Sequence, residues 1–334
     1  MCTSIKIQAK TGEVFWGRTM DLTMPLFPHG TEEFVPCVIT SIPANIEISS
    51  QVKNWQSIYS VIGVGIKDSP ILLDGVNEHG LAGDTQVLTE CGWAELSSIQ
   101  EKSKVPMLAE ELVSYMLTTC KSVSEVKECF EKFMLLNQAY QYGNRSFQYP
   151  LHFSFVDESG DGIVLETNTD GTFKSFDHLN VMTNSPRYDY HQINIRNYIG
   201  MSTTNLKNSR TLSDGNTFIP IENGTGYGMF GLPGDYTSPS RFIRSFCLSA
   251  ALDPFEKEQG MNELYSVFRT VIIPKGLERE PNNPKISDYT RYWSGYNLCE
   301  RKICVQTGES LAFTNRQLDP TLDHISYTEI KSDK

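Results

Sequence analysis

Apolar and polar residues alternate over much of residues 1–90, which is the pattern of half-buried β-strands. Residues 2–8 alternate, residues 11–13 are turn formers, and residues 14–18 are strand-like again. The chain therefore begins with a predicted β-hairpin. Similar runs between turn residues predict further strands at 34–40, 58–66, 71–74 and 81–87. We expect the strands of this region to form a consecutive antiparallel sheet.

The apolar spacing changes to a helical period after Met107, where Leu108, Leu112 and Met116 recur on one face. A second helix is predicted behind it, because Ser122 and Glu125 have the spacing of a capping box. The same two patterns then predict strands at 151–156, 163–166, 173–176 and 180–184, and helices at 188–199, 241–252 and 261–271.

Residues 205–236 interrupt this order, since they are rich in Gly, Asn, Ser, Asp and Pro. A segment of this length without regular structure is often functional. We see no repeat, linker or low-complexity stretch, so we expect residues 1–334 to form a single domain. The order sheet, helices, sheet, helices predicts a layered α+β fold, with two antiparallel sheets packed together and helices outside.

The charge and the cysteine pattern narrow the class of function. The chain has a net charge of -11 and no run of Lys and Arg, which argues against nucleic acid or an anionic membrane as its partner. No signal peptide or spanning segment is evident, so we expect a cytoplasmic protein. Neither cysteines nor histidines have zinc-ligand spacing and no phosphate loop is present, so we expect neither metal nor organic cofactor.

Cys2 directly follows the initiator methionine. Removal of Met1 would leave one residue with both a thiol and a free α-amine. An α-amine has a pKa of about 7.7 to 8.0, so it can take the thiol proton and later pass it to a leaving amine. The alternative is that Cys2 is a small apolar residue on an edge strand, and position alone does not decide between the two.

Arg18 and Asp21 lie at the far end of the predicted hairpin, where the chain has returned beside Cys2. An arginine can stabilise a thiolate and an aspartate can bind an ammonium group. The alternative is a surface ion pair of small energetic consequence. The hairpin favours the first interpretation, because it brings both charges to the cysteine.

Short motifs are spread over most of the chain. In order they are Met1-Cys2-Thr3-Ser4, Gly17-Arg18-Thr19-Met20-Asp21, Asp74-Gly75-Val76-Asn77-Glu78-His79-Gly80-Leu81, Val181-Met182-Thr183-Asn184-Ser185-Pro186, residues 188–200, Gly231-Leu232-Pro233-Gly234-Asp235-Tyr236 and Ser240-Arg241-Phe242-Ile243-Arg244. Together they resemble the choloylglycine hydrolase family, which contains penicillin V acylases and bile salt hydrolases. The resemblance implies a four-layer αββα sandwich, the N-terminal-nucleophile hydrolase fold, and a homotetramer.

The same resemblance assigns roles to four charged or nucleophilic residues. It implies that Cys2 is the nucleophile, that Arg18 lies near its sulfur and that Asp21 binds its amine. Arg241 becomes a supporting charge, whereas by itself it reads as a solvated residue at the start of a helix. The implied catalytic set also includes Asn184.

Asn184 and the backbone N–H of Val87 are the implied oxyanion hole. Without the resemblance, Asn184 reads as a turn residue before a proline. Penicillin V acylases usually have tyrosine and bile salt hydrolases asparagine at the position of Val87, so this residue departs from both patterns. A backbone donor survives that change. Asp84 and Gln86 on the same stretch predict a pocket more polar than in close relatives.

Six apolar or aromatic residues around Asp21 or after the two helices are candidates for binding an acyl group: Met20, Met24, Leu26, Phe27, Tyr140 and Tyr142. Ordinary packing is the alternative for each of them. We expect an amidase with an acyl-cysteine intermediate that acts on a small acyl amide. Residues 181–186 and 188–200 favour a penicillin V acylase-like enzyme. A bile salt hydrolase and an acyl-homoserine lactone acylase stay open, as do a non-catalytic ligand-binding relative and a redox-sensing thiol protein.

Overall fold

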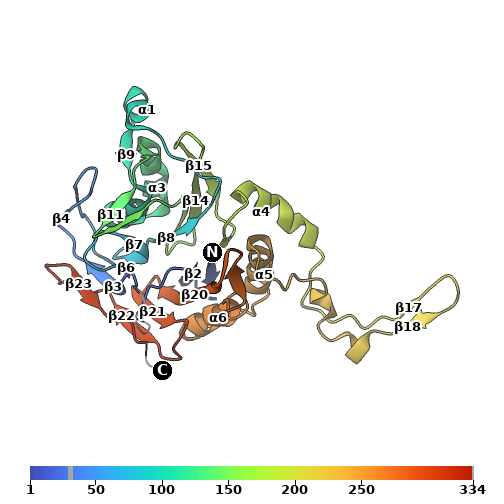
Figure 1. Ribbon diagram of the computed structural model, residues 1–334. Coiled ribbons are helices and arrows are strands. Elements are labelled where there is room, and N and C mark those ends of the chain that lie inside the picture. The colour runs from blue at the N-terminus through green and yellow to red at the C-terminus, as the bar shows by residue number, and fades with distance from the viewer. Residues whose placement is uncertain (29–32, 333–334) are drawn as a thin grey trace.

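The computed structural model describes residues 1–28 and 33–332, and its centre is a pair of antiparallel sheets (Figure 1). The first sheet has seven strands in the order β16-β1-β2-β20-β21-β22, with β19 paired to β20. Its strands are β1 (Cys2–Gln8), β2 (Val14–Leu22), β16 (Val181–Met182), β19 (Glu278–Glu280), β20 (Asn283–Asn297), β21 (Lys302–Thr307) and β22 (Thr314–Gln317).

The second sheet has eight strands in the order β15-β14-β13-β8-β7-β6-β3-β23. These are β3 (Cys37–Ile42), β6 (Val61–Ile66), β7 (Leu72–Asn77), β8 (Ala82–Val87), β13 (Leu151–Val156), β14 (Gly162–Thr167), β15 (Phe173–Asp177) and β23 (Ser326–Thr328). Six shorter strands, each of two or three residues, form three separate two-stranded sheets. In pairs they are β4 (Glu47–Ile48) with β5 (Trp55–Gln56), β9 (Val105–Met107) with β10 (Phe133–Leu135), and β11 (Tyr140–Tyr142) with β12 (Arg145–Phe147).

Helices cover the outer face of each sheet. α5 (Ser238–Ala250) and α6 (Gly260–Phe268) pack on the first sheet, and α2 (Leu112–Thr119) and α3 (Val123–Cys129) pack on the second. The remaining helices, α1 (Leu96–Glu101) and α4 (Tyr188–Asn194), lie at the periphery (Figure 1). The predicted four-layer αββα sandwich is confirmed. No helix in the described ranges is long and apolar enough to cross a membrane.

Strand β2 shows how the sequence pattern builds these layers. All but the last of its residues are buried, because both of its faces are covered. Phe15 packs with the α6 side chains, whereas Trp16 belongs to the core between the sheets and contacts Tyr296 at 5.4 Å between ring centroids. Since side chains alternate along a strand, Arg18 and Met20 share the inter-sheet face with Trp16. A charged residue is thereby placed in the interior.

The predicted elements up to residue 271 are present with shifts of a few residues at their ends. The Ser122 hydroxyl accepts the Glu125 amide as expected of an N-cap, at 3.3 Å, although the Glu125 carboxylate bonds the Lys121 amide instead of completing the box. The strands β20 to β23 had no predicted counterpart. They matter because β20 pairs with β2 from Phe15 to Leu22 and extends the first sheet to β21 and β22.

The segment rich in Gly, Asn and Ser forms a projecting arm, defined here as residues 203–232 (Figure 1). It carries the small hairpin of β17 (Arg210–Thr211) and β18 (Thr217–Phe218). Its exposed apolar side chains include Phe218, Ile219, Ile221 and Phe230. The arm therefore leaves apolar surface uncovered within this chain.

Candidate active site

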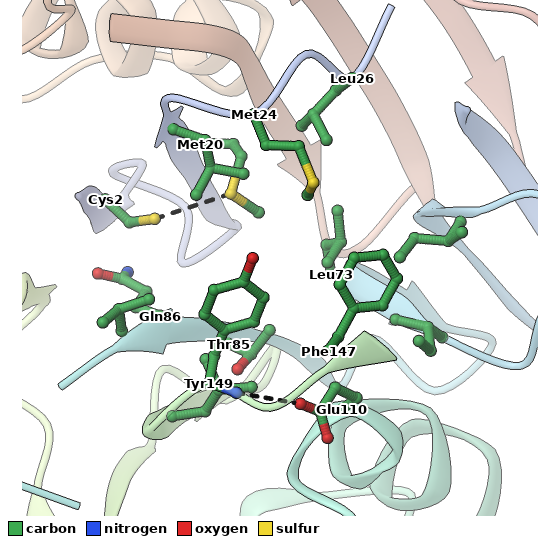
Figure 2. A pocket seen from close by; sticks show the side chains of 15 residues that line it. Cys2, Met20, Met24, Leu26, Leu73, Thr85, Gln86, Glu110, Phe147 and Tyr149 are labelled. Carbon is green, nitrogen blue, oxygen red and sulfur yellow. Dashed lines mark hydrogen bonds between the residues drawn. The ribbon is translucent and has the colours of Figure 1, made fainter. Parts of the chain in front are cut away.

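Cys2 is the first residue of β1 and lies opposite Met20 of β2. Its side chain is buried, with 2% exposed. The Cys2 Sγ lies 3.8 Å from the Met20 Sδ (Figure 2), and the Arg18 Nη2 approaches the same Sδ at 3.5 Å. The predicted hairpin thus does bring Arg18 close to the thiol. Met20 lies between the two.

Arg18 is fully buried between the two sheets. The second sheet supplies two carboxylates to it, with Nη1 3.7 Å from the Asp74 Oδ2 and Nε 3.9 Å from the Asp84 Oδ2. Burial by itself lowers the pKa of Arg18, but the charges of Cys2, Tyr292, Asp84 and Asp74 outweigh it and hold this pKa above its ordinary value. The guanidinium is therefore a permanent interior cation, and the surface ion pair alternative is wrong for it.

Asp74 is a site residue that the sequence analysis did not single out. Its carboxylate accepts hydrogen bonds from the hydroxyls of Tyr292 at 2.5 Å, of Ser294 at 2.9 Å and of Tyr296. All three donors come from β20, the strand that was not predicted. Asp74 thus connects the two sheets and positions Arg18.

Asp21 is fully buried and lies next to the N-terminus. Its carboxylate accepts the hydroxyls of Thr290 at 2.6 Å and Thr19 at 3.1 Å. In the chain with Met1 attached, the Met1 amine donates to the Asp21 carbonyl at 2.6 Å and lies 3.5 Å from the Asp288 Oδ2. Burial raises the pKa of Asp21, and the N-terminal amine and Arg241 oppose that rise. The Asp21 carboxylate is thus held by two hydroxyls while its backbone carbonyl accepts the Met1 amine, and binding of the Cys2 amine by Asp21 stays a prediction.

Asn184 and Arg241 hold Cys2 from the other side. The Asn184 Oδ1 accepts the Cys2 N–H at 2.7 Å and the Arg241 Nη2 at 2.8 Å. Arg241 also donates to the Thr3 hydroxyl and to the Cys2 carbonyl. It is fully buried on α5, so the solvated-helix interpretation of this residue is wrong. Because Cys2 and Arg241 both donate to the Asn184 Oδ1, the amide nitrogen of Asn184 points away from these two donors.

Val87 ends β8 beside Asn184. The Asn184 Nδ2 donates to the Val87 carbonyl at 2.8 Å. Leu88 donates its N–H to Pro150 at the start of β13, and successive amides of an antiparallel strand point to opposite sides, so the Val87 N–H points away from β13. The pairing of β7 with β8 has already ended at Asp84. The Val87 N–H and the Asn184 amide are therefore neighbouring donors close to Cys2.

A pocket opens beside Cys2, and the empty space in it and at its open mouth together is about 690 Å³ (Figure 2). Apolar side chains of both sheets and of the loops between them make most of its wall. The lining residues are Cys2, Met20, Leu22, Met24, Leu26, Ile66, Ile71, Leu73, Thr85, Gln86, Val87, Glu110, Phe147, Tyr149 and Leu151.

Half of the predicted acyl contacts line this pocket, namely Met20, Met24 and Leu26. The other three predicted contacts, Phe27, Tyr140 and Tyr142, are not among the described residues that line the pocket. Each of them packs elsewhere. The Phe27 ring packs edge-on against Tyr292, Tyr140 is buried in the core, and the Tyr142 hydroxyl donates to the Lys67 carbonyl at 2.9 Å.

Phe147 and Tyr149 supply the aromatic wall instead. The signal that could have found them is the turn at Gly143-Asn144, which pairs β11 with β12 and places Phe147 opposite Tyr140. The expected polarity is present only in part. Gln86 lines the pocket, but its amide nitrogen is bound to Ser4 and Asp84, and Asp84 lies outside the pocket wall with Arg18.

Comparisons with known proteins identify the family of this chain. The family model for linear amide C–N hydrolases of the choloylglycine hydrolase family matches residues 2–324. A bile salt hydrolase/transferase of Clostridium perfringens is 27% identical over all of this chain and 97% of its own length. One of Lactiplantibacillus plantarum is 28% identical, over 99% of this chain and 96% of its own length.

Two solved structures share the fold. A conjugated bile acid hydrolase from Clostridium perfringens superimposes with a TM-score of 0.86 at 24% identity, covering 99% of this chain and 98% of that one. A penicillin V acylase from Agrobacterium tumefaciens gives a TM-score of 0.72 at 20% identity, over 95% and 86% of the two chains. The resemblance seen in the motifs is confirmed. This chain is a hydrolase of linear amides and belongs to the choloylglycine hydrolase family.

Proposed function

We propose that this enzyme hydrolyses the amide bond of conjugated bile salts through an acyl-cysteine intermediate on Cys2. The observation that carries the proposal is the apolar pocket beside Cys2 in a chain whose full-length relatives include bile salt hydrolases. A steroid acyl group needs an apolar binding surface, and the wall of this pocket is made mostly of apolar side chains. Our expectation of a penicillin V acylase is less well supported by these relatives.

The first chemical step follows from the contacts of Cys2. Once Met1 is removed, the Cys2 nitrogen is an amine held by the Asn184 Oδ1. It takes the thiol proton, and the buried Arg18 cation stabilises the thiolate across Met20. The sulfur attacks the amide carbon, and the electron pair of the C=O bond moves to oxygen.

The Asn184 Nδ2 and the Val87 N–H are the proposed donors to that oxyanion. Arg241 fixes the orientation of the Asn184 amide, because it and the Cys2 nitrogen both donate to the Asn184 Oδ1. The protonated amine of Cys2 then gives its proton to the leaving nitrogen, the C–N bond breaks, and glycine or taurine departs. Water hydrolyses the thioester by the same sequence and regenerates Cys2.

The test is turnover of glycine- and taurine-conjugated bile salts beside penicillin V, with Met1-free protein verified by intact mass. We expect release of glycine or taurine to exceed release of phenoxyacetate in kcat/KM. Preferential turnover of penicillin V would reverse the substrate assignment. Cys2→Ala is the blank, and an unaltered melting temperature shows that it is folded.

We also propose that the projecting arm docks on another copy of the chain in a homotetramer. The exposed apolar residues Phe218, Ile219 and Phe230 support this, because surface of this kind is usually covered in an assembly. Sedimentation equilibrium of the enzyme and of a Phe218→Ser/Phe230→Ser variant tests it. A monomeric wild-type enzyme would contradict the proposal.

A further inference from the structure

Glu110 is an acidic residue in the wall of the apolar pocket, on the side opposite Cys2 (Figure 2). It belongs to the single 3-10 turn η1 (Ala109–Glu111) that precedes α2. Only 7% of it is exposed. Phe147, Tyr149 and Leu151 line the same pocket. A carboxyl group in such surroundings needs an explanation, because burial of an ionisable group without a partner is costly.

The partners of Glu110 are few. Its Oε1 accepts the Tyr149 N–H at 3.3 Å, which is a long hydrogen bond, and in the described ranges no cation or side-chain donor pairs with it. The adjacent Glu111 differs, since it accepts the Ser50 hydroxyl at 2.6 Å and the Gln51 amide at 3.3 Å outside this pocket. Glu110 therefore retains acceptor capacity at the cavity wall, whereas Glu111 is satisfied by the fold.

The chemistry of the wall selects the kind of partner that Glu110 can bind. Burial raises the pKa of Glu110 to about 7, so the acid and the carboxylate coexist near neutral pH. A hydroxyl group can donate to the carboxylate or accept from the acid, whereas an ammonium group would require the carboxylate and lose its hydration among apolar side chains. A neutral hydroxyl on an apolar ligand fits both forms of Glu110.

We propose that Glu110 is a specificity residue that hydrogen-bonds a hydroxyl group on the acyl moiety, at the end remote from the scissile amide. The inference rests on the proposed function, since a bile acid is an acyl group with a hydroxyl at the far end of its steroid. The phenoxyacetyl group of penicillin V has no such donor. Glu110 thereby distinguishes hydroxylated from purely apolar acyl groups.

The experiment compares two substrates that differ in this hydroxyl alone. Glycolithocholate carries one hydroxyl at the remote end of the steroid, and glycine-conjugated cholanic acid lacks it. One hydrogen bond to a partly charged group corresponds to a preference of about tenfold in kcat/KM for the hydroxylated substrate. Glu110→Leu should abolish the preference, and Glu110→Gln, which keeps an acceptor, should retain part of it. Glu111→Gln is the matched control and should keep the preference.

A second measurement separates this inference from the proposed function. Lithocholate and cholanate, the free acids, are titrated into Cys2→Ala protein and into the double variant with Glu110→Leu. A preference of about tenfold in Kd for lithocholate that disappears in the double variant supports the role of Glu110. If that preference is found but the enzyme turns over neither conjugate, the proposed function fails alone.

Two outcomes would overturn the inference. An equal preference in wild type and Glu110→Leu would show that the hydroxyl does not reach Glu110. Equal slowing of both substrates by Glu110→Leu would show a structural role only.

Discussion

Buried ionisable groups have many partners within the protein at one end of the pocket and few at the other. At the Cys2 end, Arg18, Asp74 and Arg241 are fully buried, and each has several partners from other elements of the fold. At the opposite end, the partners of the Glu110 carboxyl among the described residues are backbone amides, with a long hydrogen bond from Tyr149. Buried polar groups are normally satisfied by the protein. The first end is thus organised before substrate arrives, whereas the second is completed by the ligand.

The largest expected effect comes from removing the nucleophile. Cys2→Ala should lower kcat by at least about 10⁴-fold, because the remaining network can bind the amide but cannot form the acyl intermediate. Single-turnover assays with the Met1-free variant measure the loss, and the unchanged melting temperature is the control. Residual activity within tenfold of wild type would mean that the chemistry lies elsewhere.

Asn184→Ala is expected to have the next largest effect. Loss of one oxyanion donor reduces kcat by about 100- to 1,000-fold, and the variant also frees the Cys2 nitrogen and Arg241. Steady-state kinetics should show the loss in kcat more than in KM. The exposed Asn197→Ala serves as the matched control. An effect on KM alone would place Asn184 in binding.

Glu110→Gln tests the opposite end through stability. The folded pKa of Glu110 is raised by burial, with backbone amides opposing it and Glu111 adding to it, from 4.5 to about 7. The folded state holds the extra proton between these values, so the stability contribution is complete below about pH 4.5 and is lost as pH rises through about 7.

The variant cannot ionise, so its stability relative to wild type should improve between about pH 5 and about pH 8, by on the order of 3 kcal/mol. Urea unfolding at both pH values measures the difference. The exposed Glu128→Gln should show no such trend. Parallel pH dependence of wild type and Glu110→Gln would mean that Glu110 is not the group that titrates.

Val87→Ala should have the smallest effect on chemistry. The proposed donor is a backbone N–H, so kcat should stay within about threefold, while the smaller side chain raises KM by up to about tenfold. Initial-rate kinetics separate the two constants. A fall in kcat as large as that of Asn184→Ala would show that the Val87 side chain, and not its amide, positions the reaction.

The sequence predicted which residues come together around Cys2, because these residues are close in the chain or marked by motifs. Cys2, Arg18 and Asp21 lie within one hairpin, and alternation along β2 predicts which residues share a face. Asp74 was not recognised, because its meaning depends on hydroxyls from β20 that are 218 to 222 residues away. No local pattern records such a contact.

The pocket was predicted less well for a related reason. Its wall combines residues of both sheets with the β11–β12 hairpin, so neighbours in sequence such as Leu26 and Phe27 face different surroundings. The preference for a penicillin V acylase rested on residues 181–186 and 188–200. In the structure the first of these carries Asn184, which touches Cys2, and neither stretch contributes to the acyl wall.

The contact of the Met1 amine with the Asp21 carbonyl has a consequence for how the enzyme is made. In the proposed mechanism the amine of Cys2 acts in this corner, so we expect a chain that keeps Met1 to be an inactive precursor whose inhibitory segment is a single amino acid. The specific activity of a preparation will therefore scale with the fraction of chains trimmed, and strong overexpression will dilute it with silent enzyme.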